Sequence, residues 1–306
     1  MLGPVKYDPA LIERVCGAAA AVYASRKQRG GQSGQKGVLF ETAYASYRIA
    51  LAGHRACLEE PSGTDVWFQS QTGGFVDDLA VVTGNETTLT QAKGGAVAWS
   101  SGDHPVADDF RMQRQLDTAT GCKASYELVV SSDAHVTAMT DTRPGDLEKV
   151  AVIPFRCTGQ DWLGLFAAHP ELEQALDTIS IHPPRRIVRE QTFQAIVGLW
   201  LHRGCRGSLL DLMTTLAERS DALVRIPGPD YQLPSDVAAA LAGASDLTWS
   251  IKGRHFSYAV GSLTGWAAYL CGSEPFNRFE RFMVEQTPTD WKPVVRELRR
   301  EPGDDR

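Results

Sequence analysis

The sequence predicts an α/β protein in which a mixed central sheet, flanked by helices, is followed by a mainly helical region. Short apolar runs bounded by turn residues occur between residues 65 and 155 and have the length and composition of strands. Segments with apolar residues at helical spacing precede and separate these runs. From about residue 161 onward the helical spacing dominates. The alternation of helical and strand-like segments before residue 161 favours a sheet with helices on its faces.

Two helices are expected before the first strand. Apolar residues at helical spacing predict one helix over residues 9–25 and a second over residues 38–58. The segment between them, RKQRGGQSGQKG, contains close glycines and no apolar residue. Such a segment cannot bury a face, so we expect it to break the helix and form a loop.

The sheet is expected to form over the following part of the chain. The predicted strands cover residues 65–70, 78–83, 87–93, 126–131 and 150–155, with a helix over residues 108–118. The link Gly84-Asn85-Glu86 is short and turn-like. The second and third strands are therefore expected to form a β-hairpin.

The remainder of the chain is expected to be helical. Helices are predicted over residues 190–202, 208–219, 235–244 and 256–270, with Ser235 as an N-cap. The change of pattern falls near His182-Pro183-Pro184. We therefore predict a domain over residues 1–184 and a mainly helical region over residues 185–306, which would serve oligomerisation or partner binding.

Composition sets the broad class of protein. The chain has 306 residues, 43% hydrophobic and 22% charged, which is the balance of an ordinary globular protein. No apolar run approaches the roughly 20 residues of a membrane span, and the N-terminus lacks the apolar core of a secretory signal. The six cysteines are scattered, without zinc-type pairs. They predict a reducing compartment, the cytoplasm, while the lack of a long apolar run predicts no membrane partner.

The residues that carry chemistry lie around the predicted hairpin. Side chains alternate between faces along a strand, so Gln91 and Lys93 are expected to project together. Asp78 opens the neighbouring strand, and the twelve residues between it and Gln91 are enough for two short strands and a tight turn. The hairpin therefore returns Gln91 and Lys93 beside Asp78. Glu41, one turn into the second helix, is placed to add a carboxylate.

This group of side chains suits metal-assisted phosphodiester cleavage. Mg²⁺ takes oxygen ligands in an octahedron and keeps several waters. Glu41, Asp78 and Gln91 would supply carboxylate and amide oxygens to it, and Mn²⁺ can substitute. Lys93 would orient the attacking water or stabilise the charge that develops on the phosphate.

The same residues resemble the PD-(D/E)XK, or restriction-endonuclease-like, nuclease superfamily. The pattern is G-x-x-F-E-x-x-Y, then D-D before apolar residues, then Q-x-K-G, and it is clearest over residues 30–100. It looks most similar to the N-terminal endonuclease domain of bacterial anti-phage effectors of the CBASS type. The resemblance implies a restriction-endonuclease-like core and a Mg²⁺-dependent endonuclease that cuts double-stranded DNA in the bacterial cytoplasm. It also implies a homo-oligomer or a separate sensor protein as partner.

Two features depart from the family pattern. Gln91 is neutral where many relatives have an acid, which lowers the negative charge of the site. Asp77 and Asp78 are adjacent, so only one can face the site. Asp78 is chosen because the family's Asp directly precedes the apolar strand, and Asp77 is expected to cap or bond locally.

Two other functions are compatible with this sequence pattern. A ribonuclease of the same fold, or an inactive protein that binds nucleic acid or serves assembly, would carry the same pattern. The net charge of −6 is unlike that of a dedicated DNA-binding protein, but a nuclease needs only a local basic track. The loop before Glu41 either provides such a basic track or is an ordinary solvated loop. Its candidate nucleic-acid contacts are Arg26, Lys27, Arg29 and Lys36.

Overall fold

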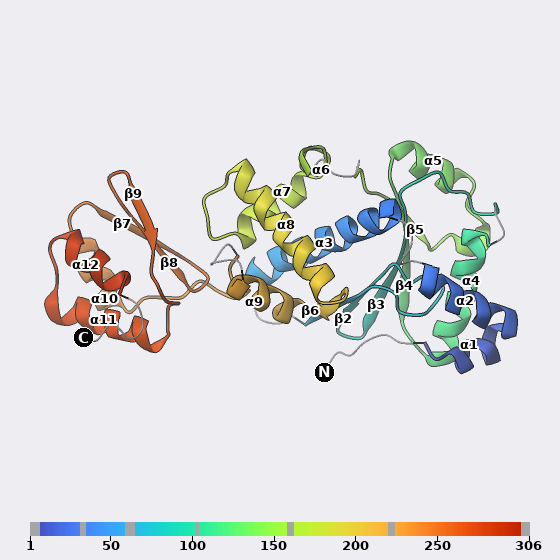
Figure 1. The fold of residues 1–306 in the computed structure, drawn as a ribbon, viewed down its shortest axis with the longest axis horizontal. Coiled ribbons are helices and arrows are strands. Elements are labelled where there is room, and N and C mark those ends of the chain that lie inside the picture. Colours follow the sequence, from blue (N-terminus) through green and yellow to red (C-terminus); the bar gives the residue numbers. More distant parts are fainter. Residues whose placement is uncertain are drawn as a thin grey trace.

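The computed structural model describes residues 7–30, 35–58, 65–101, 104–157, 162–219 and 224–300. The molecule is elongated (Figure 1), with a larger group of elements around a six-stranded sheet and a smaller group around a three-stranded sheet at the C-terminal end. The α/β class is confirmed, as a mixed six-stranded sheet with helices. The small antiparallel sheet and its helices come later in the chain.

The larger sheet has the strand order β5-β4-β3-β2-β1-β6. Its pairs are antiparallel from β6 through β1 and β2 to β3, and parallel from β3 through β4 to β5. The strands are β1 (Val66–Gln69), β2 (Leu79–Thr83), β3 (Glu86–Lys93), β4 (Ala124–Val130), β5 (Ala151–Pro154) and β6 (Arg206–Ser208). The predicted β2–β3 hairpin is confirmed, and β1 to β5 match the five predicted strands to within two residues at each end.

The N-terminal helices differ from the prediction. Gly17 separates α1 (Pro9–Cys16) from α2 (Ala18–Gly30), because its φ of 90° is left-handed and ends the first helix. The prediction of one helix over residues 9–25 is therefore wrong. Helix α2 continues through residues that were predicted to form a loop, and α3 (Gln35–Leu58) begins before the predicted start. Residues 31–34 of that loop lie outside the described residues.

Helices cover both faces of the larger sheet. On one face α3 packs with α7, α8 and α9 around side chains such as Phe68, Ile179 and Trp200. On the other face α4 and α5 cover Ala80, Leu89 and Leu128. The bounds are α4 (Val106–Thr120), α5 (Asp133–Asp141), a 3-10 helix (Gly145–Leu147), α6 (Trp162–Ala168), α7 (Pro170–Ile179), α8 (Arg186–His202) and α9 (Leu209–Arg219).

The packing around the larger sheet continues beyond the boundary predicted near residue 184. Helix α8 packs on α3, strand β6 pairs with β1, and the same hydrophobic core extends to Val224. Strand β6 is three residues long, too short for its sequence to show a strand pattern. The core of the larger group therefore extends to Val224, and the core of the C-terminal group begins after it.

The C-terminal group has a core of its own, around Phe256, Phe276 and Phe279. Its elements are α10 (Ser235–Gly243), β7 (Leu247–Lys252), β8 (His255–Val260), β9 (Leu263–Trp266), α11 (Glu274–Gln286) and α12 (Trp291–Leu298). The predicted helix over residues 256–270 is wrong. Phe256 and Tyr258 are buried at a two-residue spacing, and the left-handed Gly261 turns β8 into β9. Ser235 is the first residue of α10, and Pro234 occupies the N-cap position instead.

None of the described helices has the length and apolar character required to cross a membrane.

Candidate active site

The hairpin brings three of the predicted site residues together. Leu79 pairs with Thr90, so Asp78 stands across from Gln91 at the end of the hairpin. The Asp78 Oδ2 atom accepts hydrogen bonds from the Ala92 backbone N–H at 2.7 Å and from the Gln91 side-chain amide. Lys93 Nζ lies 3.9 Å from the same oxygen. Asp78 therefore faces the Q-x-K motif, as the register of the predicted hairpin requires.

Helix α3 brings Glu41 to this end of β3. Phe40 of this helix packs against Gly94, where an added Cβ would come within 3.2 Å of the buried Phe40 ring. Glycine after Lys93 therefore lets α3 approach closely. Burial raises the pKa of Glu41 to about 7, the charges of Asp78 and Asp77 also raise it, and Lys93 and Lys27 lower it. Within the described residues, the Glu41 carboxylate makes no hydrogen bond or ion pair.

A lysine from outside the motif occupies the buried side of this cluster. Lys27 of α2 donates from Nζ to Gln91 Oε1 at 2.7 Å, to Asp109 Oδ2 at 3.0 Å and to the Phe75 carbonyl oxygen. Its Nζ is also 3.6 Å from Asp77 Oδ1. Burial lowers the pKa of Lys27, but Asp77, Asp109 and Asp78 together hold it above its ordinary value. The ammonium is therefore charged at neutral pH.

The side chain of Lys27, a predicted nucleic-acid contact, points inward and is only 16% exposed. The reason is that α2 continues through Lys27 and puts it on the same face as the buried Ala20 and Ala24. Arg26 is exposed on α2 and is free to meet solvent. The side chains of Arg29 and Lys36 lie outside the described residues.

Two further acids belong to the cluster. Asp77 is 3% exposed and pairs with Lys27, whereas we expected it to cap or bond locally. Burial raises the pKa of Asp77 more than Lys27 lowers it. Asp109, in the first turn of α4, is 4% exposed. Its Oδ2 also accepts from the Tyr23 hydroxyl at 3.4 Å, while Oδ1 is buried without a hydrogen-bond partner among the described residues.

Sequence reasoning missed Lys27 and Asp109 as parts of the site. The available signal was helical spacing. Lys27 continues the buried face of α2, and Asp109 lies on the face of α4 that also carries Val106 and Phe110. Spacing of this kind shows that a polar residue faces the core, but it does not show which partner it meets.

The donor set fits a divalent cation that retains much of its hydration. Among the described residues, no group of three or more His, Cys, Asp and Glu side chains is arranged to hold a metal ion. Mg²⁺ nevertheless is commonly held by one or two carboxylates, with waters and substrate phosphates completing its shell. Glu41 and Asp78 supply two such groups. The raised pKa of Glu41 reflects burial and negative charge that a bound cation would offset.

Comparison with protein-family models, with curated proteins and with solved structures finds no match to this chain.

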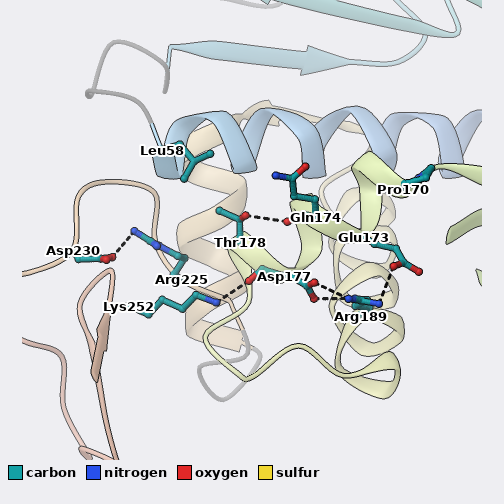
Figure 2. A pocket seen from close by; sticks show the side chains of 10 residues that line it. All are labelled: Leu58, Pro170, Glu173, Gln174, Asp177, Thr178, Arg189, Arg225, Asp230 and Lys252. Atoms are coloured by element: carbon teal, nitrogen blue, oxygen red, sulfur yellow. Dashed lines mark hydrogen bonds and ion pairs between the residues drawn. The ribbon is translucent and has the colours of Figure 1, made fainter. Parts of the chain in front are cut away.

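A hollow lies between the two groups of elements (Figure 2), with a volume of about 540 Å³. Its charged side chains already have partners. Arg189 pairs with Asp177 at 2.7 Å and also with Glu173, and Arg225 pairs with Asp230 at 2.8 Å. Lys252 donates to the carbonyl oxygens of residues 177 and 180. The acidic and basic side chains that line this hollow therefore balance each other.

Proposed function

We propose that the protein is a Mg²⁺-dependent endonuclease that cleaves double-stranded DNA. The observation that carries this proposal is the meeting of Asp78, Gln91 and Lys93 at one end of the hairpin, with Glu41 added from α3. An acidic group with a lysine beside it suits hydrolysis of a phosphodiester, which develops negative charge on phosphate oxygens.

The side chains would divide the work as follows. Glu41 and Asp78 would hold Mg²⁺, which when bound supplies positive charge at the phosphate and lowers the pKa of water. Asp78 is fixed through Oδ2, and its Oδ1 makes no hydrogen bond among the described residues. Lys93, 33% exposed, can donate to a phosphate oxygen of the substrate.

The resemblance to anti-phage effectors supports a wider proposal. The protein would act in bacterial defence, with a second copy of itself or a sensor protein as partner. The segment after Arg185 would contribute to that association, because it includes the separate C-terminal group.

The second candidate is an inactive protein of the same fold that binds nucleic acid. One observation favours it: the Gln91 oxygen, which would be a metal ligand in the family pattern, is already bonded to Lys27.

The test is incubation of the purified protein with supercoiled plasmid, linear DNA and RNA, each with Mg²⁺, with Mn²⁺ or with EDTA. We expect nicking and linearisation of plasmid with either metal and none with EDTA. Cutting of RNA alone would replace the proposal with a ribonuclease. Binding of nucleic acid without cutting in any metal would favour the inactive protein.

A further inference from the structure

Gln91 lies between a buried cation and the Asp78 carboxylate. Its side chain is fully buried, its Oε1 accepts from Lys27 Nζ at 2.7 Å, and its Nε2 donates to Asp78 Oδ2. The three side chains thus form one continuous chain of hydrogen bonds from α2 through β3 to the start of β2. The contact between Lys27 and Gln91 joins residues 64 positions apart.

The chemistry of the two neighbours fixes which way the Gln91 amide points. An ammonium group only donates, and an ionised carboxylate only accepts. The amide oxygen must therefore face Lys27 and the amide nitrogen must face Asp78. A carboxylate at position 91 could accept from Lys27 but would have no hydrogen to give Asp78, and its charge would repel that residue.

Lys27 is itself held by groups from other elements. Its Nζ contacts the Phe75 carbonyl oxygen and Asp77, both in the segment before β2, and Asp109 of α4. These contacts leave the ammonium little freedom to turn away from Gln91. They also place a positive charge beside the Gln91 oxygen, where a divalent cation would be repelled.

We propose that Gln91 is a positioning residue rather than a metal ligand, and that Lys27 orients its amide so that it holds Asp78 towards the metal. This inference rests on the nuclease function proposed above and refines the roles at the same site. It gives a reason for glutamine where related motifs have an acid, since only an amide can accept from Lys27 and donate to Asp78 at once.

The substitution Gln91→Glu separates the two roles. A metal ligand changed from amide to carboxylate would bind Mn²⁺ more tightly, whereas a positioning residue that loses its donor to Asp78 would bind it less tightly. The measurement is titration calorimetry of Mn²⁺ into the purified protein without nucleic acid. We expect about a 10- to 100-fold weaker Kd for Gln91→Glu and for Gln91→Met, the usual effect of losing a partner that orients a ligand. An unchanged or tighter Kd for Gln91→Glu overturns the proposal.

A double-mutant cycle tests whether Lys27 acts through Gln91. If it does, Lys27→Met and Gln91→Met each weaken Mn²⁺ binding, and the double variant is little worse than either. If the losses of Mn²⁺ affinity are additive, Lys27 has a separate role, and the claim that it acts through Gln91 is overturned. Lys149→Met is the matched control, because Lys149 is exposed. Should Lys27→Met fail to fold, with Asp77 and Asp109 left unpaired, Lys27→Met combined with Asp109→Asn removes one of those buried charges.

Proton exchange of the Gln91 side-chain amide tests the same chain of bonds without metal. The NMR signal of this amide group is assigned by its absence from the spectrum of Gln91→Met. We expect slow exchange in the wild-type protein and faster exchange in Lys27→Met; fast exchange in both refutes the arrangement. A protein that binds Mn²⁺ but cuts no nucleic acid would refute the proposed function and leave this inference standing. If the wild type binds no Mn²⁺, the proposed role of Gln91 towards a metal is overturned, and the exchange measurement reports only on the chain of hydrogen bonds.

Discussion

Glu41, Asp77 and Asp109 are acids whose pKa burial raises, and they lie around one buried lysine. With Asp78 they make four carboxyl groups against the ammonium groups of Lys27 and Lys93. When all four are ionised, negative charge exceeds positive charge in this partly buried cluster. Clusters of this kind occur at functional sites because the charge that destabilises the free protein attracts a ligand.

The first prediction concerns Lys93. We expect Lys93→Ala to lower the rate of DNA cleavage about 100-fold or more, because the variant loses a donor to developing phosphate charge. Its free energy of unfolding should change by less than about 1 kcal/mol, since the side chain is one-third exposed and its ion pair is long. Cleavage rates and chemical denaturation check both parts, with Lys149→Ala as the control. Wild-type cleavage by Lys93→Ala would exclude a catalytic role.

The second prediction concerns Glu41 and pH. Its pKa rises from 4.5 in the unfolded chain to about 7 in the folded protein. Between these values the folded state binds more protons than the unfolded state, so stability present below about pH 4.5 is lost as pH rises through about 7. We expect metal-free Glu41→Gln to be more stable than the wild type above pH 7, by about 1–3 kcal/mol.

Thermal unfolding in EDTA across pH 4 to 8 measures this effect. The difference between Glu41→Gln and the wild type should shrink as the pH falls, because Glu41 then becomes neutral in both states. A difference that is constant over this range would show that the carboxyl group titrates at its ordinary pKa.

At the scale of elements, the segment before β2 connects Lys27 to the hairpin. Gln113 of α4 holds this segment, because its Oε1 accepts from the backbone N–H groups of Phe75 at 2.8 Å and Val76 at 3.2 Å. The segment leads directly into Asp77 and Asp78. Helix α4 therefore supports the site both through Asp109 and through Gln113.

The third prediction tests that support. A Cβ at Gly74 would collide with Gln113 Oε1 and come within 3.1 Å of the Tyr7 ring. We expect Gly74→Ala to destabilise the protein by about 1–3 kcal/mol and to lower cleavage, because the displaced Gln113 releases the segment. Gly145→Ala is the control, since a Cβ there meets no atom within 4 Å. Denaturation midpoints should separate the two variants; equal midpoints would mean that the segment adjusts freely.

At the scale of the whole molecule, the C-terminal group is joined to the larger group through the region shown in Figure 2. Lys252 of β7 donates to the carbonyl oxygens of Asp177 at 2.7 Å and Ser180 at 2.6 Å, at the end of α7. His182 and Trp266 make an edge-on ring contact at 4.8 Å. The junction thus combines two hydrogen bonds from one lysine with an aromatic contact.

The fourth prediction concerns this junction. Lys252→Met should lower the free energy of unfolding by about 1–3 kcal/mol, because two carbonyl oxygens lose a charged donor. Limited proteolysis between residues 224 and 234 should become faster, while DNA cleavage should persist because Lys252 is not part of the active site. Lys292→Met, at an exposed position of the same group, is the control. Unchanged proteolysis would show that other contacts hold the junction.

The hairpin and the meeting of Asp78 with Gln91 and Lys93 were predictable from sequence. They depend on strand alternation and on a short turn, and both act over a few residues. The same local signals located β1 to β5 and the beginning of the site. They failed at residues 256–270, where apolar residues fitted a helical and a strand spacing, and the pairing of β8 with β7 and β9 decided the structure.

Only the tertiary structure decided what surrounds the hairpin. Lys27 contacts Gln91 and Asp109 across 64 and 82 positions of sequence, through the packing of α2 and α4. The pairing of β6 with β1 likewise depends on α8 and α9 packing beside the sheet. Local spacing specifies which face of an element is buried, because it depends on backbone geometry alone. The identity of the buried partner depends on long-range contacts, which no single segment encodes.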